Sequence, residues 1–356
     1  MEYNFQLIEN VITRKEIPEV IPLYEHFVDD PVIEQIMGYN FSEIDTTVED
    51  GIVETWKKRI EFYRQMGYVY VPVELGVKFA PRATKMTKHD DISDTIKRNW
   101  VDEREGPIQN MDDLHNPEYW PDVEKAFDYE LFERIADLLP QGMKIIGGAS
   151  GGPFEHASFL MGLESLCIAI YENPELVQVL FEKIGKTLVG IAERLVKLDK
   201  LGAYRFGDDL GYKNATMISP DLLRKYVFPW QKRVVEAVHK AGKPFVLHSC
   251  GQLEAVMEDL INDVKIDAKH SFEDVILPVT EAKKRWGHRI AILGGIDVDF
   301  LCRSTTKEIK EHTKKILEVC SKGGGYAAGS GNTITSYMPP QNYLAMLDAV
   351  REFNGM

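Results

Sequence analysis

The chain has 356 residues, of which 44% are hydrophobic and 28% are charged, and its formal net charge is −14. These values are ordinary for a soluble globular protein with a sizeable core, and the negative charge without a basic stripe argues against nucleic acid as a partner. No apolar run approaches the roughly 18–20 residues that cross a bilayer, no secretory signal is visible, and four widely spaced cysteines argue against a disulfide framework. We therefore expect a cytoplasmic protein without a membrane partner.

Residues 1–66 are predicted to be mainly helical, as an extension over the outside or bottom of the domain that follows. From there, a short apolar segment, a Gly- or Asp-rich break and an amphipathic helix alternate along the chain. Residues 75–130 are interpreted as an insertion and loop region over or beside that domain. Strands are predicted at 68–74, 143–148, 203–207, 244–248, 265–270, 290–294 and 325–329.

Three helices between these strands have recognisable starts. Asn173 and Ser219 each precede a first-turn proline, and Thr305 with Glu308 fits a capping box. Repeated strand–helix units imply a parallel sheet, either an open doubly wound sheet or a closed (β/α)8 barrel.

Two features favour the barrel. No Gly-x-Gly-x-x-Gly fingerprint follows the first strand, as a dinucleotide-binding sheet would be expected to show. Polar residues also follow one strand after another, and barrel enzymes assemble their sites from the C-terminal ends of several strands. These residues are Glu74, Ser150, Asp208, Asp209, His248, Cys250, His270, Asp297, Ser330 and Asn332. We predict a single α/β domain over 1–356, a (β/α)8 TIM barrel whose eighth strand lies within 75–105.

The stretch FVLHSCGQ, at 245–252, contains the candidate metal ligands. Alternation along a strand sends residues i and i+2 to the same side, so His248 and Cys250 would present an imidazole and a thiolate to one point, which suits zinc. A hydrogen-bonded histidine and a small apolar cysteine beside a tight turn at Gly251 would explain the same pair without a metal. The third ligand stays open, and the better placed oxygen ligands are Asp208, Asp209, Glu155 and Ser330.

Asp208 and Asp209 are adjacent acids at a strand end, and His270 follows another strand. Two neighbouring carboxylates raise one pKa, which would keep a proton available for donation, so all three residues are candidate catalytic groups. The alternative is that one acid caps a helix, the other faces solvent, and the histidine is structural.

Candidate substrate-binding residues come from other strand ends. The glycine-rich bend GGASGG, before Glu155 and His156, lets the backbone approach a ligand closely. Glu74 is expected to face the barrel mouth, with a salt bridge as its alternative. Trp100, Tyr119 and Trp120 are expected either to line an apolar pocket or to pack on the barrel. The complete substrate-binding set is Glu74, Glu155, His156, Ser330 and Asn332.

Several stretches together resemble the uroporphyrinogen decarboxylase superfamily, strongly over about 200–350 and more weakly over the whole chain. They are GDDLGYK, LHSCGQ, IDAKHSFED, GGID and GYAAGSGNTI. The resemblance implies a (β/α)8 barrel. It also implies one of two activities: metal-free decarboxylation of uroporphyrinogen, or zinc-dependent methyl transfer to or from a separate corrinoid protein.

Details of the sequence separate these two branches. Residues 19–38 correspond to the arginine-rich stretch of the decarboxylases but contain no arginine. This region therefore lacks cations that would bind a substrate with eight carboxylates. His248-Ser-Cys250 matches the zinc-binding H-x-C of the methyltransferases, whose third ligand is a cysteine where this chain has Ser330. No Asp-x-His-x-x-Gly corrinoid motif is present, so the corrinoid is expected on a partner protein.

The sequence therefore predicts a corrinoid-dependent methyltransferase acting on a small methylated substrate, with an aryl methyl ether (O-demethylation) as the best candidate. The oxygen that loses the methyl group needs a Lewis acid or a proton. Zinc on His248, Cys250 and a carboxylate would supply the first; a protonated Asp208 or Asp209, or His270, would supply the second. The alternatives are a decarboxylase of a uroporphyrinogen-like or small carboxylic acid, and a non-catalytic protein that binds a corrinoid or another small ligand.

Overall fold

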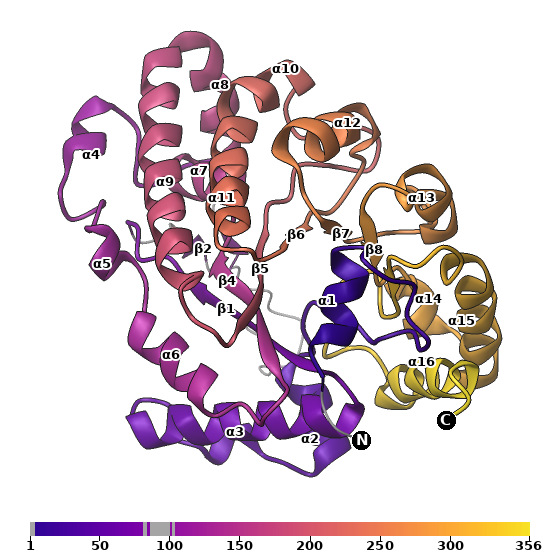
Figure 1. The fold of residues 1–356 in the computed structure, drawn as a ribbon. Coiled ribbons are helices and arrows are strands. Elements are labelled where there is room, and N and C mark those ends of the chain that lie inside the picture. The colour runs from indigo at the N-terminus through magenta and orange to yellow at the C-terminus, as the bar shows by residue number, and fades with distance from the viewer. Residues whose placement is uncertain (1–3, 81–83, 86–99, 102–103) are drawn as a thin grey trace, which may run out of the picture.

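The computed structural model describes residues 4–80, 84–85, 100–101 and 104–356 (Figure 1). Its centre is a curled sheet of seven parallel strands in the order β1-β4-β5-β6-β7-β8-β9. The strands are β1 (Tyr70–Gly76), β4 (Lys144–Ser150), β5 (Leu201–Gly207), β6 (Phe245–His248), β7 (Ala268–His270), β8 (Ala291–Leu293) and β9 (Tyr326–Ala327). Each predicted strand is confirmed to within a few residues. The fold is α/β and resembles a TIM barrel, because sequential strands lie side by side with helices between them.

The strands read as apolar runs because they are covered on both faces, as in parallel sheets generally. Every residue of β5 and β6 is buried, including the charged Arg205 in the middle of β5. A charge at such a position needs a partner inside the protein, and that partner lies at the strand ends described below.

The eighth strand predicted within 75–105 does not join the sheet in the residues that the structure describes. In the described part of 75–105, β2 (Thr84–Lys85) and β3 (Trp100–Val101) pair only with each other. Residues 22–28 lie instead beside the chain that follows β9, with parallel bridges from Leu23 to Ala328 and from Val28 to Ile334. On the other side, the Tyr70 hydroxyl of β1 bonds the backbone of Glu25 at 2.7 Å. The N-terminal region therefore supplies an extended segment between β9 and β1.

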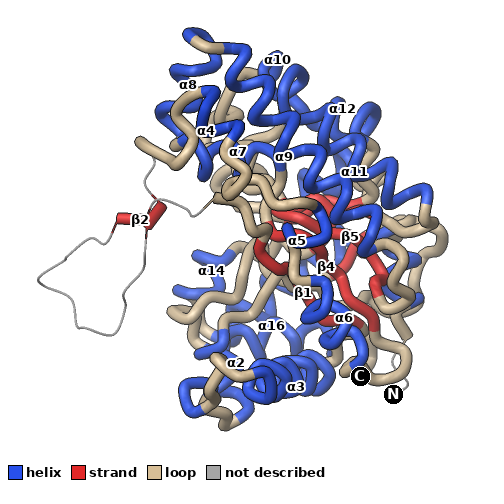
Figure 2. The backbone as a smooth tube through the Cα atoms, turned by 90° about the vertical axis from the view of Figure 1, so that its left-hand side faces the viewer, coloured by secondary structure: helices blue, strands red, loops and turns tan. Residues whose placement is uncertain are grey.

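The helices form an outer layer around the sheet (Figure 2). Of the predicted starts, Asn173 and Ser219 accept the expected backbone hydrogen bonds, and Thr305 with Glu308 forms a complete capping box. No helix in the described residues is long and apolar enough to cross a membrane. In chain order the helical elements are α1 (Gln6–Ile12), α2 (Asp30–Met37), η1 (Phe41–Glu43), α3 (Glu49–Met66), α4 (Met111–His115), α5 (Val123–Ala126), α6 (Tyr129–Asp137), α7 (Pro153–Met161), α8 (Leu163–Glu172), α9 (Pro174–Leu195), α10 (Pro220–Leu222), η2 (Leu223–Val227), α11 (Phe228–Lys240), η3 (Glu254–Val256), α12 (Met257–Asp259), η4 (Leu260–Val264), α13 (Val279–Trp286), α14 (Val298–Arg303), α15 (Thr306–Cys320) and α16 (Pro340–Phe353).

Candidate metal centre

The ends of β6 and β7 bring two histidines and a cysteine together. His248 pairs with His270 in the sheet register, and their Nδ1 atoms lie 2.8 Å apart. Cys250 follows two residues after His248, and its Sγ lies 3.5 Å from Nε2 of that histidine. The turn that presents the cysteine depends on Gly251, whose φ is +81° and where an added Cβ would lie 2.2 Å from the backbone carbon of Gly211.

The hydrogen bonds around these histidines fix which ring nitrogen carries a proton. Nε2 of His270 lies 3.1 Å from the carbonyl oxygen of Ser330, which can only accept, so this nitrogen donates. Burial lowers the pKa of His270 to about 3 and that of His248 well below its ordinary value, so both rings are neutral. Nδ1 of His270 must then accept, and Nδ1 of His248 donates to it. Nε2 of His248 is consequently left with a lone pair directed at the Cys250 sulfur.

This lone pair, the thiol and one carboxylate fit a zinc ion. At a tetrahedral zinc, bonds of about 2.3 Å to sulfur and about 2.0–2.1 Å to nitrogen put those two atoms about 3.5 Å apart, which is the separation seen for His248 and Cys250. A carboxylate oxygen of Asp209 lies within 4.8 Å of the Cys250 sulfur and of a ring nitrogen of His248, and its Oδ1 accepts the Cys250 backbone N–H at 2.9 Å. Without a metal, burial raises the pKa of the Cys250 thiol.

His26 belongs to the same cluster and was missed from the sequence. Its ring stacks on that of His248 with centroids 3.8 Å apart and an angle of 11°. Ring nitrogens of His26, His248 and His270 also lie within 4.8 Å of one another. However, stacking leaves the His26 nitrogens in a plane parallel to the His248 ring, and Nδ1 of His248 is already bonded to His270. Asp209, His248 and Cys250 are therefore the better ligand set.

Ser330 and Asn332 reach this cluster from the chain after β9. Nδ2 of Asn332 donates to the Cys250 sulfur at 3.4 Å. The Ser330 hydroxyl, in contrast, is bonded to Glu25 at 2.5 Å and to the Asn332 carbonyl oxygen at 2.6 Å. Ser330 therefore supports the cluster through its backbone oxygen, and its side chain is occupied elsewhere.

The neighbouring acids Asp208 and Asp209 have different surroundings. The carboxylate of Asp208 is fully buried and accepts the Glu155 N–H at 2.9 Å at the start of α7, as well as the side-chain amide of Gln231 at 2.7 Å. An added Cβ at Gly152 would lie 2.3 Å from Cγ of Asp208, so the glycine-rich bend lets the helix approach this acid. Burial raises the pKa of Asp208 to about 7 against these hydrogen bonds.

Glu74 forms the buried salt bridge that was its alternative interpretation. Its Oε1 lies 2.5 Å from Nε of Arg205, and both side chains are almost wholly excluded from solvent. Arg205 also donates to the Tyr24 hydroxyl at 3.3 Å and lies over the Phe27 ring. Burial raises the pKa of Glu74, and Arg205 opposes that shift. The pair gives no net charge to the barrel interior.

The remaining predicted residues divide between the cluster and the packing around it. The Glu155 carboxylate and the His248 ring both approach Gly207, 3.8 Å and 3.7 Å from the Cβ that a substitution would add there. The buried His156 ring packs against Phe79, as does Trp120. Tyr119 and Trp120 pack on the core, and the side chain of Trp100 lies outside the described residues.

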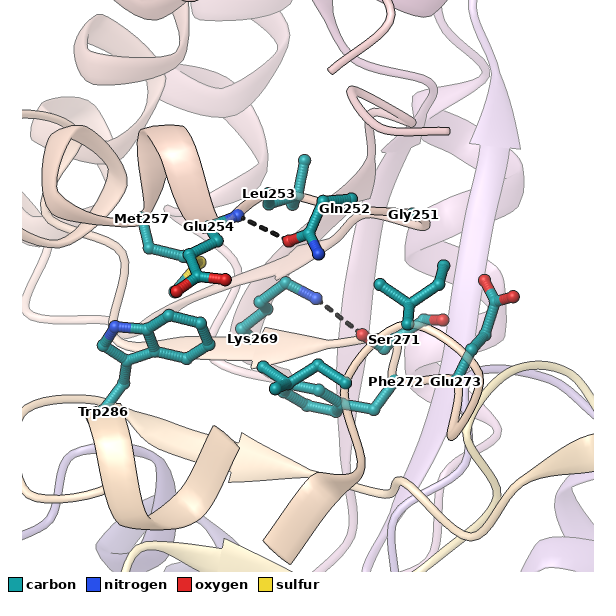
Figure 3. Close-up of a pocket in the computed structure, with 12 residues that line it drawn as sticks. Gly251, Gln252, Leu253, Glu254, Met257, Lys269, Ser271, Phe272, Glu273 and Trp286 are labelled. Carbon is teal, nitrogen blue, oxygen red and sulfur yellow. Dashed lines mark hydrogen bonds between the residues drawn. The ribbon is translucent and has the colours of Figure 1, made fainter. Parts of the chain in front are cut away.

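Lys269 is a buried cation that sequence reasoning also missed. Adjacent to His270 on β7, it points to the opposite face, into a small cavity beside Trp286 (Figure 3). Its ammonium donates to the carbonyl oxygens of Ser271 at 2.6 Å and Ser249 at 3.1 Å. Burial lowers the pKa of Lys269 to about 8. Since these carbonyls follow the two histidines directly, Lys269 holds the ends of β6 and β7 together.

A wide cavity of about 880 Å³ opens beside the cluster. Asn332, which donates to Cys250, forms part of its wall. Its aromatic lining comes from Phe272, Phe300 and Tyr337. Its charged lining is mainly acidic, from Asp29, Glu273, Asp274, Asp297 and Asp299, with Arg303 as the cation among the described lining residues.

Comparison with known proteins identifies relatives of two kinds. A family model described as "Uroporphyrinogen decarboxylase (URO-D)" matches residues 103–353. A uroporphyrinogen decarboxylase from Anaeromyxobacter dehalogenans is 27% identical over 62% of this chain and 60% of its own length, so the chain matches about three fifths of that relative. The methylcobamide:CoM methyltransferase MtbA of Methanosarcina acetivorans is 24% identical over 65% of this chain and 68% of its own. Among solved structures, a methyltransferase from Methanosarcina mazei superimposes with a TM-score of 0.72 at 17% identity, covering 99% of both chains.

Proposed function

The chain belongs to the uroporphyrinogen decarboxylase family, and within that family we propose that it is a methyltransferase. It would move a methyl group from a small methylated substrate, best an aryl methyl ether, to the Co(I) corrinoid of a separate protein. MtbA, whose name describes a methylcobamide:CoM methyltransferase, is a relative over two thirds of its length.

One observation carries the proposal: the unprotonated Nε2 of His248 faces the Cys250 sulfur at 3.5 Å, with the Asp209 carboxylate in reach. A nitrogen lone pair, a thiolate and a carboxylate form a three-ligand set, which leaves a fourth position open as catalytic zinc sites do. The hydrogen bond from His248 to His270 orients the ring, as is usual for histidines that bind metals.

When bound, zinc would supply a Lewis acid for the oxygen that loses its methyl group. The protein's own groups hold and shape the site. Asn332 would stabilise the thiolate through its amide, and Lys269 would keep the two strand ends in register. The Glu155 carboxylate and the His248 ring both approach Gly207, so Glu155 would lie at the edge of this site.

The cavity beside Asn332 is the proposed entrance. Phe272, Phe300 and Tyr337 offer apolar and aromatic surface to a methoxyarene, and the proposed corrinoid partner would dock at this side of the barrel. Its acidic lining would repel a substrate that carries several carboxylates. This is the structural argument against the uroporphyrinogen substrate.

The test compares the wild type with Cys250→Ala after anaerobic purification, measuring zinc content and loss of the Co(I) absorbance of free cob(I)alamin with a panel of aryl methyl ethers. We expect about one zinc per chain and methyl transfer in the wild type, and neither in the variant. Cys167→Ala, a change in α8 away from the strand ends, is the matched control and should retain both. Wild-type protein that binds zinc but transfers no methyl group from any methylated donor would refute the assignment.

Decarboxylation is the second candidate, and the observation that favours it is Asp208. Burial raises the pKa of this carboxyl to about 7, so about half of the molecules hold a proton at neutral pH that could be donated to a carbanion. Against it, hydrogen bonds from α7 and Gln231 already engage both oxygens. Release of carbon dioxide from a carboxylic acid substrate, lost in Asp208→Asn but not in Cys250→Ala, would favour this candidate. Thermal stabilisation by a corrinoid or another ligand without either reaction would indicate a binding protein.

A further inference from the structure

The Ser330 hydroxyl makes two short oxygen–oxygen contacts, and each of them needs a hydrogen between the two oxygens. The hydroxyl carries only one hydrogen. Its Oγ lies 2.5 Å from Oε2 of Glu25 and 2.6 Å from the carbonyl oxygen of Asn332. A carbonyl oxygen cannot donate, so the hydroxyl proton belongs to the contact with Asn332. An ionised Glu25 cannot donate either, and two oxygens at 2.5 Å without a proton between them would repel each other. The second proton must therefore come from Glu25.

The surroundings of Glu25 favour the same state. The residue is fully buried, and within the described residues its carboxyl oxygens contact the N–H and hydroxyl of Ser330 but no cation. Arg205, a nearby cation, is already paired with Glu74. Burial raises the pKa of Glu25 to about 8, against hydrogen bonds from Ser330 that oppose the shift. The ionisable groups that sense its charge are phenols: Tyr24, Tyr63, Tyr68, Tyr70, Tyr326 and Tyr343.

Ser330 connects this acid to both halves of the metal pair. Its hydroxyl holds the backbone of Asn332, whose side-chain amide donates to Cys250. Its own carbonyl oxygen accepts from His270, which sets the proton position in His248. The hydrogen-bonded route from Glu25 to Cys250 and His248 therefore runs through Ser330.

We propose that Glu25 is a neutral carboxylic acid that donates to the Ser330 hydroxyl, and that it is a positioning residue for Cys250 and His248. An ionised Glu25 would take the hydroxyl proton of Ser330 for itself, because a charged acceptor forms the stronger hydrogen bond. The Asn332 carbonyl would then lose its donor, and the amide that faces Cys250 would lose its anchor. The positioning role rests on the proposed metal site, whereas the neutral state of Glu25 does not.

Infrared spectroscopy of the metal-free full chain tests the protonation state. Wild type minus Glu25→Gln should show a protonated carboxylic acid C=O band at neutral pH, which disappears as the pH rises through about 8. Glu19→Gln, which changes an exposed acid of the same region, is the matched control and should show no such band. Ser330→Ala should shift the band, because the acid loses its acceptor. A carboxylate band in place of the acid band would overturn the proposal.

Zinc affinity, measured by competition with a chelator, tests the positioning role. Glutamine reproduces both contacts of a neutral acid, since its carbonyl accepts from the Ser330 N–H and its amide donates to the hydroxyl, so Glu25→Gln should bind zinc within about threefold of the wild type. Glu25→Ala and Ser330→Ala should bind about tenfold or more weakly, as is typical when support for a metal ligand is lost. If Glu25→Ala does not fold, Ser330→Ala and the glutamine variant still decide the question.

Three outcomes are distinguishable. Equal loss of affinity in Glu25→Gln and Glu25→Ala would mean that the charge of Glu25 is required, and would overturn the neutral assignment. Wild-type affinity in Ser330→Ala would overturn the positioning role. Wild-type protein without zinc affinity would overturn the proposed function and the positioning role together, and the infrared bands would still decide the protonation of Glu25.

Discussion

Two groups of buried polar side chains lie at the strand ends, and they satisfy their hydrogen bonds in different ways. Around β1 and β5, charges are matched within the protein: Glu74 pairs with Arg205, and Asp208 faces the N–H groups at the start of α7. Around β6, β7 and β9, neutral groups form a chain that ends at Nε2 of His248, whose lone pair faces the Cys250 sulfur. In the first group the partners neutralise each other, whereas the second presents a nitrogen and a sulfur that could both bind a metal ion.

The largest expected effect lies in the second group. Cys250→Ala removes the sulfur ligand, so zinc content should fall from about one per chain to near zero, with methyl transfer lost. The free energy of unfolding of the metal-free protein should change by much less, because the thiol is only partly buried and its bonds are weak. If the variant keeps its zinc, Cys250 is not a metal ligand. The second group would then not differ from the first in its ability to bind a metal. Metal analysis and urea unfolding of the same preparations measure both quantities.

The first group should respond in the opposite way. Arg205→Met leaves the Glu74 carboxylate buried without its partner, which should lower the free energy of unfolding by about 3–5 kcal/mol. The double variant Arg205→Met with Glu74→Leu should recover most of this loss, because no unpaired charge remains. Lys186→Ala, which breaks an exposed pair with Glu182, should change stability by no more than about 0.5 kcal/mol. Equal effects of the buried and the exposed change in urea unfolding would contradict the assignment.

The strands and helix starts of both groups could be predicted from the sequence, because they depend on local signals. Apolar runs bounded by glycine and aspartate marked the strands, and Asn173, Ser219 and Thr305 marked helices through caps that the structure shows. The pairing of His248 with Cys250 was also predictable, since strand alternation is a local rule.

The missed residues depend on contacts between distant parts of the chain. Segment 22–28 contains Pro22, Glu25 and His26 and does not read as a strand; its place is set by bridges to Ala328 and Ile334. The two adjacent acids could not be told apart, because Asp208 is set by the approach of α7 through Gly152. A charge inside a buried strand was the available signal for Arg205 and Lys269. Such a charge indicates that a partner lies next to it in the folded protein, but the sequence does not identify that partner.

A smaller effect should appear in the pH dependence of stability. Burial raises the pKa of Asp208 to about 7 from an unfolded value of about 4, so the folded protein holds a proton between these values that the unfolded chain has lost. Its contribution is therefore fully present below about pH 4 and is lost as the pH rises through about 7. The stability of the wild type relative to Asp208→Asn should fall across this window and level off above it. A constant difference in urea unfolding at pH 4, 5, 6 and 7 would mean that Asp208 is already ionised.

The smallest effect tests whether the second group acts as a connected chain. Asn332→Ala removes one long N–H···S bond to Cys250, worth roughly 0.5–1.5 kcal/mol for an ordinary hydrogen bond, so zinc should bind about two- to tenfold more weakly. Thr333→Ala, at the next residue in the same cavity wall, should leave the affinity unchanged. In Ser330→Ala, the further loss from Asn332→Ala should be smaller than in the wild type, because the amide has already lost its anchor. Additive losses in chelator competition would show that Asn332 acts on Cys250 independently of Ser330, and that the neutral chain divides into separate contacts.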